Sequence, residues 1–401
     1  MTDLVTRTLR PEELRTANAL FRAALHAKPI SDEEWPAAER AYQPERNLGV
    51  FDSGTGELLG TARSTDADLT VPGGAAVPLA AVTGVGVRAD RTRRGVLTEL
   101  MRAQFDELAG RGVTAATLYA TEGAIYGRFG YGVATLSRSL TVRKARARFR
   151  PEVPSGGECE LLDLDTALER LPGIYADLPR QPGMMARSSY WWRSMWIALR
   201  QASEPVVTVV HHGPRGADGF AQYRVVGRQP GFSGTMRLLG LHAGNAEALA
   251  GLWRFLLGVD LVDEITAEGR PLGEPVELLF TDPRACEVTG TGDETWLRLV
   301  DVPAALAARA WEGEPLVVEV TDPVLEHNTG RFRVGRDGVE RTRSSPQLRL
   351  GVDALAMTYL GAWRPSALAQ VGRAQLAGEG IAERADRLFG TRVAPWCGTF
   401  F

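Results

Sequence analysis

The chain has few cysteines, and their placement excludes two classes of protein. Cys159, Cys286 and Cys397 lie far apart in a sequence of 401 residues. Disulfide-stabilised domains need an even set of cysteines, and structural zinc sites need closely spaced pairs. The adjacent pair His211-His212 is no better a metal site, because neighbouring strand residues point to opposite faces. We therefore expect neither a disulfide framework nor a metal.

Long apolar runs are also missing. A membrane-spanning helix needs about 18 or more consecutive apolar residues, and the sequence contains no such run. The first residues, MTDLVTRTLRPEEL, lack the apolar region of a signal peptide. We therefore expect a cytoplasmic protein that has no membrane partner.

Positive charge is not in excess. The chain has 46 basic and 49 acidic residues, and its formal net charge is -3. Proteins that bind nucleic acid carry a basic face, so we expect no nucleic-acid partner. The most basic stretch, Ser137 to Phe149, could be a phosphate-binding patch or the solvated face of a strand, and its alternation favours the strand.

The length predicts more than one domain. Single hydrophobic cores stop growing at roughly 250–300 residues, and this chain has 401. Pro151, Pro154 and Gly156-Gly157 mark a linker. Before it, the predicted elements follow the order α–β–β–β–α–β–α. We predict an α/β (α+β) protein of two or three domains, the first of which comprises residues 1–150.

The segment from Val82 to Tyr131 is the most informative part of the chain. Val82 to Val87 alternate as a strand does, and an arginine-rich loop follows. Gly95 opens a helix with one apolar face, formed by Val96, Leu97, Leu100, Met101, Phe105 and Leu108. Unpaired N–H groups and the helix dipole favour an anion at a helix start. Residues 92–98 are therefore a candidate cradle for a pyrophosphate.

Two cofactors that contain a pyrophosphate compete for this segment. Gly84-x-Gly86-x-x-Ala89 fits the dinucleotide fingerprint, which requires its glycines at the turn from strand to helix. Here Gly84 and Gly86 lie inside the predicted strand. In addition, no acidic residue ends a strand about twenty residues further on, as ribose binding would need. The other interpretation, coenzyme A, rests on a resemblance of this segment to a known family.

Two motifs resemble one branch of the GNAT acetyltransferases. Arg93-Arg94-Gly95-Val96-Leu97 departs from the general motif Gln/Arg-x-x-Gly-x-Gly/Ala at its first and last positions, which are occupied by Thr92 and Leu97. It is similar to the Arg-Arg-Gly turn of the Eis (enhanced intracellular survival) N-acetyltransferases. The chain ends in Cys397-Gly398-Thr399-Phe400-Phe401, which resembles the Cys-Gly-Thr-x-Phe end of the same family.

The resemblance implies a fold and a co-substrate. It predicts two GNAT-like domains, residues 1–150 and 151–290, the second without a cofactor site. A sterol-carrier-protein-like α+β domain, residues 291–401, follows them and delivers the C-terminus. It also predicts acetyl-CoA, bound along the parted strand, at the Arg-Arg-Gly turn and after the next strand. The residues assigned to it are Val85, Gly86, Val87, Arg93, Arg94, Gly95, Val96, Leu97, Thr98, Thr121 and Glu122.

The resemblance also assigns two catalytic residues. GNAT proteins carry a tyrosine that points at the cofactor sulfur, and Tyr126 matches it; the alternative is that Tyr126 is a core aromatic. In the Eis family the terminal carboxylate enters the active site as a base, which gives this role to Phe401. Because the tail Gly398 to Phe401 is apolar and small, we predict that both terminal phenylalanines are buried.

The acceptor implied by the resemblance is a primary amine, either of a small molecule, with aminoglycosides considered, or of a lysine. The candidate substrate-binding residues are Trp35, Thr83, Gly84 and Phe400. Family members with broad aminoglycoside activity have acidic residues around the pocket, whereas Phe400 stands at the penultimate position here. A cluster of tryptophans, Trp191, Trp192 and Trp196, either lines a substrate pocket or packs in a core or a subunit interface.

The family also implies a homo-hexamer and, if aminoglycosides are acceptors, a role in antibiotic resistance. The alternative function is a non-enzymatic scaffold that binds coenzyme A or lipid. The intact Tyr126 and the intact chain end favour the enzyme.

Overall fold

The computed structural model describes residues 4–227 and 233–401. The chain divides into two compact units. One unit comprises Met1–Thr135, Pro182–Ile197 and Thr295–Phe401, and the other comprises Leu136–Gln181 and Ala198–Glu294. Across the described ranges, no helix combines the length and the apolar character that crossing a membrane would require.

The first unit contains a seven-stranded sheet in the order β1-β2-β3-β4-β5-β14-β6. Its strands pair antiparallel except for β4 and β5, which run parallel. Their bounds are β1 Leu4–Thr8, β2 Asn47–Asp52, β3 Leu58–Thr70, β4 Ala76–Val87, β5 Ala115–Leu118, β14 Trp296–Leu299 and β6 Gly132–Val133. The sheet therefore carries the predicted strand Val82 to Val87 as the second half of β4.

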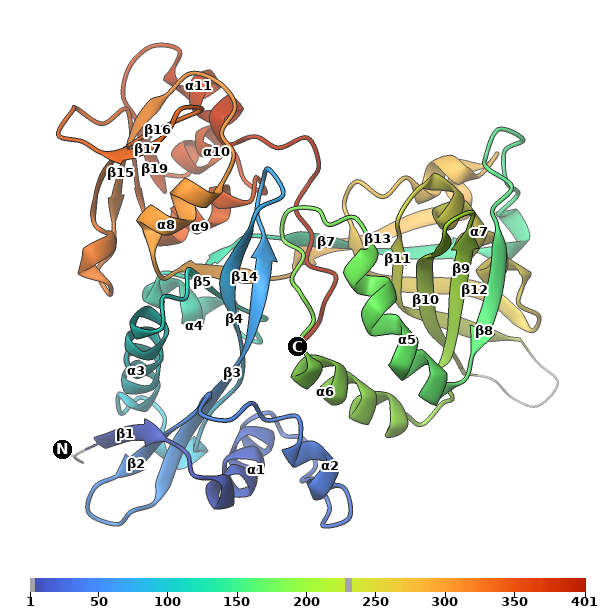
Figure 1. Ribbon diagram of the computed structural model, residues 1–401, viewed down its shortest axis with the longest axis horizontal. Coiled ribbons are helices and arrows are strands. Elements are labelled where there is room, and N and C mark those ends of the chain that lie inside the picture. The colour runs from blue at the N-terminus through green and yellow to red at the C-terminus, as the bar shows by residue number, and fades with distance from the viewer. Residues whose placement is uncertain (1–3, 228–232) are drawn as a thin grey trace. The chain divides into compact units, whose positions relative to one another are not determined.

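Four helices belong to this sheet (Figure 1). They are α1 Leu14–Ala24, α2 Trp35–Glu39, α3 Val96–Gly110 and α4 Gly123–Tyr126. The predicted apolar face of α3 is buried, with the exception of Leu97. Burying this face against the sheet fixes the N-terminal end of α3 beside β4, where the candidate cradle lies.

The second unit contains another seven-stranded sheet, in the order β13-β7-β12-β11-β10-β9-β8. Its strands are β7 Leu136–Arg143, β8 Glu158–Leu162, β9 Val207–Gly213, β10 Gly216–Val226, β11 Gly234–Ala243, β12 Val262–Pro271 and β13 Cys286–Asp293. The helices are α5 Leu164–Asp177 and α7 Ala246–Gly258, while α6 Ser189–Arg200 spans the boundary between the units. This unit is also α/β.

The two sheets exchange a strand along the chain. The basic segment that begins at Ser137 forms β7, which pairs with β12 and β13 of the second sheet. Strand β14, which follows the second unit in sequence, pairs with β5 and β6 of the first sheet. Between β12 and β13, Val276–Leu279 forms a 3-10 helix, in which the Leu278 N–H donates to the Pro275 carbonyl.

The last quarter of the chain contains a five-stranded sheet in the order β17-β16-β15-β18-β19. Its strands are β15 Leu316–Thr321, β16 Gly330–Gly335, β17 Gly338–Arg341, β18 Leu348–Gly351 and β19 Ala374–Leu376. Its helices are α8 Val302–Ala308, α9 Val352–Tyr359, α10 Pro365–Gln370 and α11 Ile381–Phe389. The α/β (α+β) class predicted from the sequence is confirmed by these three mixed sheets and their helices.

This last part packs against the first sheet through a shared core. The core joins buried residues of β3, β4 and β14 to those of β15, β18 and α9. A fully buried ion pair crosses it, in which Arg298 Nη2 of β14 lies 2.7 Å from an oxygen of Asp322. Because the buried charges of Arg298 and Asp322 must stay paired, this ion pair holds the C-terminal part in a fixed register on the first sheet.

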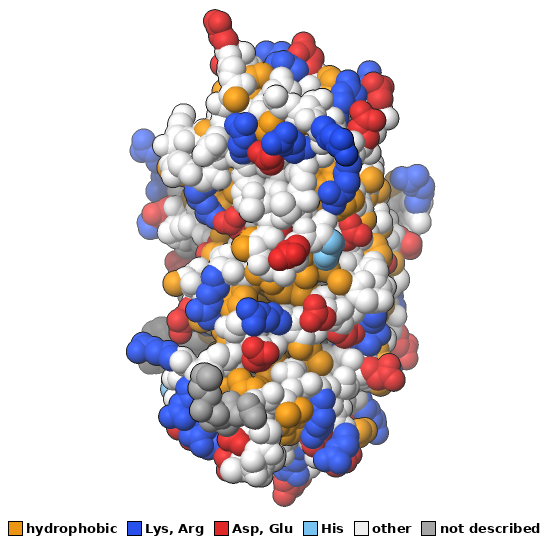
Figure 2. All heavy atoms as spheres, turned by 90° about the vertical axis from the view of Figure 1, so that its left-hand side faces the viewer, with side chains coloured by type: hydrophobic (Ala, Val, Ile, Leu, Met, Phe, Trp, Pro, Cys, Tyr) orange, Lys and Arg blue, Asp and Glu red, His pale blue; other side chains and the backbone are white. Residues whose placement is uncertain are grey.

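Charges of both signs are mixed on the surface. Figure 2 shows one face of the molecule, on which Lys and Arg side chains are interspersed with Asp and Glu. A face of this kind does not concentrate positive charge as a nucleic-acid interface does.

Candidate active site

The site lies where β4 and β5 part. These strands pair from Leu79 with Ala115 to Ala81 with Thr117, and β5 ends at Leu118 while β4 continues to Val87. On its other side, β4 has a bulge, since its register with β3 shifts between Thr61 and Arg63. Gly84 adopts φ +63° at this bulge, a conformation that favours glycine. The backbone of β4 thereby turns toward the space beyond β5.

A cavity of about 670 Å³ lies beside this strand and the start of α3. Arg93 and Gly95, with φ of +60° and +85°, form the left-handed turn that opens the helix. No side chain caps this helix start. Its first N–H groups are therefore open to an anion, which the helix dipole also favours. Among the residues that line the cavity are Val85–Val87, Arg93, Gly95–Thr98, Thr121 and Glu122.

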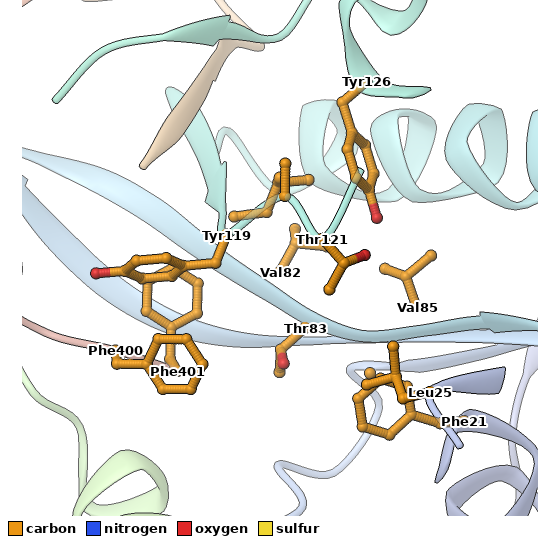
Figure 3. A pocket seen from close by; sticks show the side chains of 13 residues that line it. Phe21, Leu25, Val82, Thr83, Val85, Tyr119, Thr121, Tyr126, Phe400 and Phe401 are labelled. Carbon is orange, nitrogen blue, oxygen red and sulfur yellow. The ribbon is translucent and has the colours of Figure 1, made fainter. Parts of the chain in front are cut away.

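A second cavity, of about 250 Å³, adjoins the first. The two share four lining residues, Leu25, Val85, Thr121 and Tyr126. In Figure 3, Phe400, Phe401 and Tyr119 gather on one side of the narrow cavity, and Phe21 and Leu25 of α1 lie on another. A molecule in each cavity would meet the other at Tyr126.

Tyr126 lies at this junction and is buried. Tyr126 is the last residue of α4, and 7% of its surface is exposed. Burial raises the pKa of Tyr126, and the negative charge of Glu122 raises it further. The hydroxyl therefore stays protonated at neutral pH and can donate a hydrogen bond into the junction.

Three side chains hold the backbone of the chain end. Arg187 Nη2 donates to the Gly398 carbonyl at 2.8 Å, and the Tyr119 hydroxyl donates to the Thr399 carbonyl at 3.1 Å. These two bonds fix the residues that lead into the site. Thr399 is consequently buried, with 1% of its surface exposed.

The third donor is an indole. Trp191 Nε1 donates to the Phe400 carbonyl at 2.7 Å, and the Arg187 guanidinium lies 4.3 Å from the Trp191 ring centroid. Of the two sequence interpretations of Trp191, packing is the one that matches its 9% exposure. The last carbonyls of the chain are thus all engaged, and Phe401 is directed to the narrow cavity that it lines.

The predicted burial of both terminal phenylalanines is wrong for Phe400, which is 76% exposed, whereas Phe401 is half-buried. Phe400 forms part of the cavity wall, and its ring centroid lies 4.8 Å from that of Tyr119. The Phe401 ring packs edge-on against Tyr119 at 5.3 Å. The tail is therefore anchored by its backbone, which leaves one ring free to face the cavity.

The predicted residues are thus mostly brought together. Thr83, Gly84 and Phe400 line the narrow cavity with Phe401. Arg94 is not among the residues that line the wide cavity. Trp35 also lies elsewhere, at the start of α2, in a small core with its ring centroid 6.0 Å from that of Tyr42.

Comparison with known proteins adds independent information. Residues 5–134 and 183–299 each match an acetyltransferase (GNAT) domain, and residues 302–398 match a sterol carrier protein domain. An uncharacterized N-acetyltransferase of Streptomyces coelicolor is 37% identical, covering 97% of this chain and 98% of its own. The N-acetyltransferase Eis of Mycobacterium tuberculosis is 32% identical over 90% of each chain.

The chain belongs to the Eis family of GNAT N-acetyltransferases. The crystal structure of Eis1 from Mycobacterium abscessus covers both chains completely, with 39% identity and a TM-score of 0.91. A GCN5-related N-acetyltransferase from Anabaena variabilis, at 18% identity and a TM-score of 0.85, has the same fold over its full length. The predicted Eis resemblance, the two GNAT-like domains and the sterol-carrier-like domain are confirmed.

Membership of the Eis family also confirms the predicted activity. The chain is an N-acetyltransferase, and GNAT acetyltransferases use acetyl-CoA. The wide cavity of this Eis-family fold fits that co-substrate, because an uncapped helix start and an arginine-bearing turn face it. The remaining length of the cavity runs along Val85–Val87, beside which an extended chain can lie.

Sequence reasoning missed several residues of the Eis-family site. Tyr119 directly follows the buried strand β5 and lies two residues before Thr121, and this position was a signal that could have been used. Phe21 lies in α1 and Leu25 directly follows it, and nothing in the sequence connects these two residues to the site. Arg187 and the tail that it binds are 211 residues apart. No local pattern predicts such a pairing.

Proposed function

We propose that this enzyme moves the acetyl group of acetyl-CoA to a primary amine that binds in the narrow cavity. The observation that supports this most strongly is the meeting of the two cavities at Tyr126 and Val85, with Phe401 in the wall of the narrow one. Within the chain, residues 1–150 would supply catalysis and 151–290 a second GNAT-like domain. Residues 291–401 would deliver the carboxylate.

The cofactor-binding residues act by position and charge. In this proposal the N–H groups at the start of α3, together with Arg93 and Arg94, hold the pyrophosphate. When bound, acetyl-CoA supplies an acetyl group activated as a thioester. The backbone N–H groups of Val85 or Val87 are placed to donate to the thioester oxygen as negative charge develops there.

Tyr126 is proposed as the acid. As the C–N bond forms and the C–S bond breaks, the sulfur gains negative charge and accepts the hydroxyl hydrogen. A phenol with a pKa of about 10 facing a thiol of about 8.5 makes full proton transfer uphill by about 2 kcal/mol. Burial raises the pKa of Tyr126 and increases that gap. Hydrogen-bond donation to the sulfur is therefore its main contribution, with the proton transferred as the thiol leaves.

The Phe401 carboxylate is proposed to bind and orient the amine as its ammonium ion. An α-carboxyl has a pKa of about 3.5 and an alkyl ammonium of about 10, so direct deprotonation is uphill by about 8 kcal/mol. Three routes lower this cost: burial that raises the carboxyl pKa, binding of the deprotonated amine, or a water relay. In each of them the carboxylate still places the nitrogen at the junction of the cavities.

Thiol release from acetyl-CoA, measured across a panel of amines, tests the proposal. Tyr126→Phe should leave acetyl-CoA affinity unchanged and lower kcat by about ten- to a thousand-fold, as loss of an acid does. Tyr131→Phe is the matched control. Its ring centroid lies 5.8 Å from that of Tyr126, and its buried hydroxyl has no hydrogen-bond partner among the described residues. If both variants kept the parent kcat, Tyr126 would be a core aromatic.

We also propose a cytoplasmic homo-hexamer, as in the family that the chain resembles, with small-molecule amines as its substrates. Light scattering checks the assembly, and a mass near 43.5 kDa would contradict it. An effect on antibiotic resistance would require aminoglycosides to be acceptors, which the amine panel measures directly. The alternative function, a scaffold that binds coenzyme A or lipid, predicts no thiol release with any amine.

A further inference from the structure

The lining of the narrow cavity carries no charged side chain. Thirteen residues form it, and none is Asp, Glu, Lys, Arg or His. Its polar side-chain groups are the hydroxyls of Thr83, Tyr119, Thr121 and Tyr126. The single formal charge in this wall is the terminal carboxylate of Phe401. An acceptor in this cavity can therefore pair one ammonium group but not several.

Cationic side chains lie close behind two parts of this wall. Gly84 has no side chain, and a Cβ placed there would lie 2.9 Å from Cγ and 3.3 Å from Nε of Arg63. The Arg63 guanidinium in turn lies 4.6 Å from the Tyr42 ring centroid. Arg187 binds the tail from behind at Gly398. A second or third ammonium on the acceptor would be repelled by these arginines.

The remaining wall is aromatic and aliphatic. Phe400 and Phe401 both pack on Tyr119, with centroid distances of 4.8 and 5.3 Å, and Phe21 and Leu25 lie across the space (Figure 3). Aromatic walls bind apolar bodies and attract a single cation to their faces. The volume of about 250 Å³ is below the range of roughly 300–1,000 Å³ that is common for ligand pockets. The acceptor is accordingly small.

We propose that the acceptor is a small primary monoamine with an aromatic or aliphatic body, and that this enzyme discriminates against polycations. The inference rests on the proposed function. The ammonium pairs with the Phe401 carboxylate, the body packs between Phe400 and Phe21, and Phe400 determines the specificity. In the reaction, the C–N bond forms, the C–S bond breaks, and the amine loses one proton while the sulfur gains one.

The 401-residue enzyme, with Phe401 as its last residue, tests this with two acceptors. The kcat/KM for 2-phenylethylamine should exceed that for spermidine by about a hundred-fold, because unpaired ammonium groups bind poorly in an apolar cavity. Equal values, or a preference for spermidine or an aminoglycoside such as kanamycin, would overturn the inference.

Two variants at one position sharpen the test. Phe400→Glu adds a carboxylate to the wall and should raise the spermidine to 2-phenylethylamine ratio of kcat/KM by about ten-fold or more. Glutamine has nearly the shape of glutamate but no charge. Phe400→Gln should therefore lower kcat/KM for 2-phenylethylamine without raising it for spermidine. Phe400 is 76% exposed, so neither change removes a core residue. If Phe400→Glu and Phe400→Gln gave the same ratio, Phe400 would not determine specificity.

Acetyl-CoA affinity, measured by calorimetry without any amine, separates this inference from the proposed function. Absence of binding would contradict the cofactor site itself. Binding together with turnover of polyamines but not of monoamines would contradict the monoamine inference and leave the proposed function intact. Binding without turnover of any amine would count against both.

Discussion

The two GNAT domains of this chain share one strand order but differ at the position where a cofactor would bind. In the first, residues 88–95 connect β4 to α3, and the helix starts at Gly95 without a side-chain cap. In the second, Gly244 and Asn245 alone connect β11 to α7. Asn245 Oδ1 accepts the Ala248 N–H at 2.9 Å. The first helix start is open to an anion, and the second is already satisfied.

The space between the parted strands differs in the same way. In the first domain a cavity lies beyond the last pair of β4 and β5. In the second, Arg270 of β12 donates to the Leu241 carbonyl of β11 at 2.9 Å and binds Glu274 through Nη2 at 2.6 Å. Arg270 is 3% exposed, so a buried ion pair occupies this part of the second domain.

The comparison shows that the topology of a GNAT sheet does not by itself make an acetyl-CoA site. The loop before the helix and the residue that caps the helix decide whether an anion can bind there. The side chain near the end of the second parted strand, Arg270 of β12 in the second domain, decides whether an extended chain can enter. These features support the prediction that the second domain has no cofactor site.

Altering the chain end should have the largest effect on the activity of the first domain. Removing Phe401, or extending the chain beyond it, should lower kcat by about 10²–10⁴-fold, because the carboxylate that we propose orients the amine is lost or displaced. Acetyl-CoA affinity should stay nearly unchanged, since the wide cavity does not include Phe401. The control is the same tag at the N-terminus. Full activity of the extended enzyme would show that the tail only packs.

Breaking the buried ion pair of the second domain should lower the stability of the protein but not its kcat. Arg270→Met leaves the Glu274 carboxylate buried without the guanidinium that binds it, which costs about 3–5 kcal/mol of unfolding free energy. Thermal and denaturant unfolding measure this loss, while kcat of the folded enzyme should match the parent. The double variant Arg270→Met with Glu274→Met should recover most of the stability. A selective loss of kcat would mean that the second domain takes part in the reaction.

The smallest expected effect concerns the start of α3. Gly95→Asp should weaken acetyl-CoA binding by about ten-fold or more, because it places a negative charge at the helix start that we propose holds the pyrophosphate. Gly112→Asp is the control at the other end of the same helix, since both glycines have positive φ and no atom within 4 Å of an added Cβ. Calorimetry measures both variants. If the two variants bound acetyl-CoA with equal affinity, the start of α3 would not be the pyrophosphate site.

Local sequence was enough to predict the parts of the site that lie on one segment. The strand before the Arg-Arg-Gly turn, the helix after it and Tyr126 form a continuous unit, and short-range patterns describe such units well. The chain end was recognised from the motif that finishes at Phe401. In each case the information needed lay within a few residues.

The rest depended on contacts that are distant in sequence. Arg187 and Trp191 bind carbonyls of the last residues, 211 and 209 positions away. Trp35 was proposed for the substrate pocket because it is an aromatic beside acidic residues, yet its ring packs near Tyr42. The exchange of β7 and β14 also went unpredicted, because a strand shows its apolar face in the sequence but not the sheet that it joins.

The strand exchange has a consequence for how the protein is made. A ribosome produces β5 long before β14. Until β14 has been synthesised, the edge of β5 that pairs with β14 in the finished protein is unpaired. All of Ala115–Leu118 is buried in the finished protein, as are Leu297 and Leu299, which arrive later. An unpaired apolar strand invites pairing with other chains. During synthesis the first sheet therefore depends on completion of the chain up to β14, and an isolated fragment of residues 1–150 should aggregate.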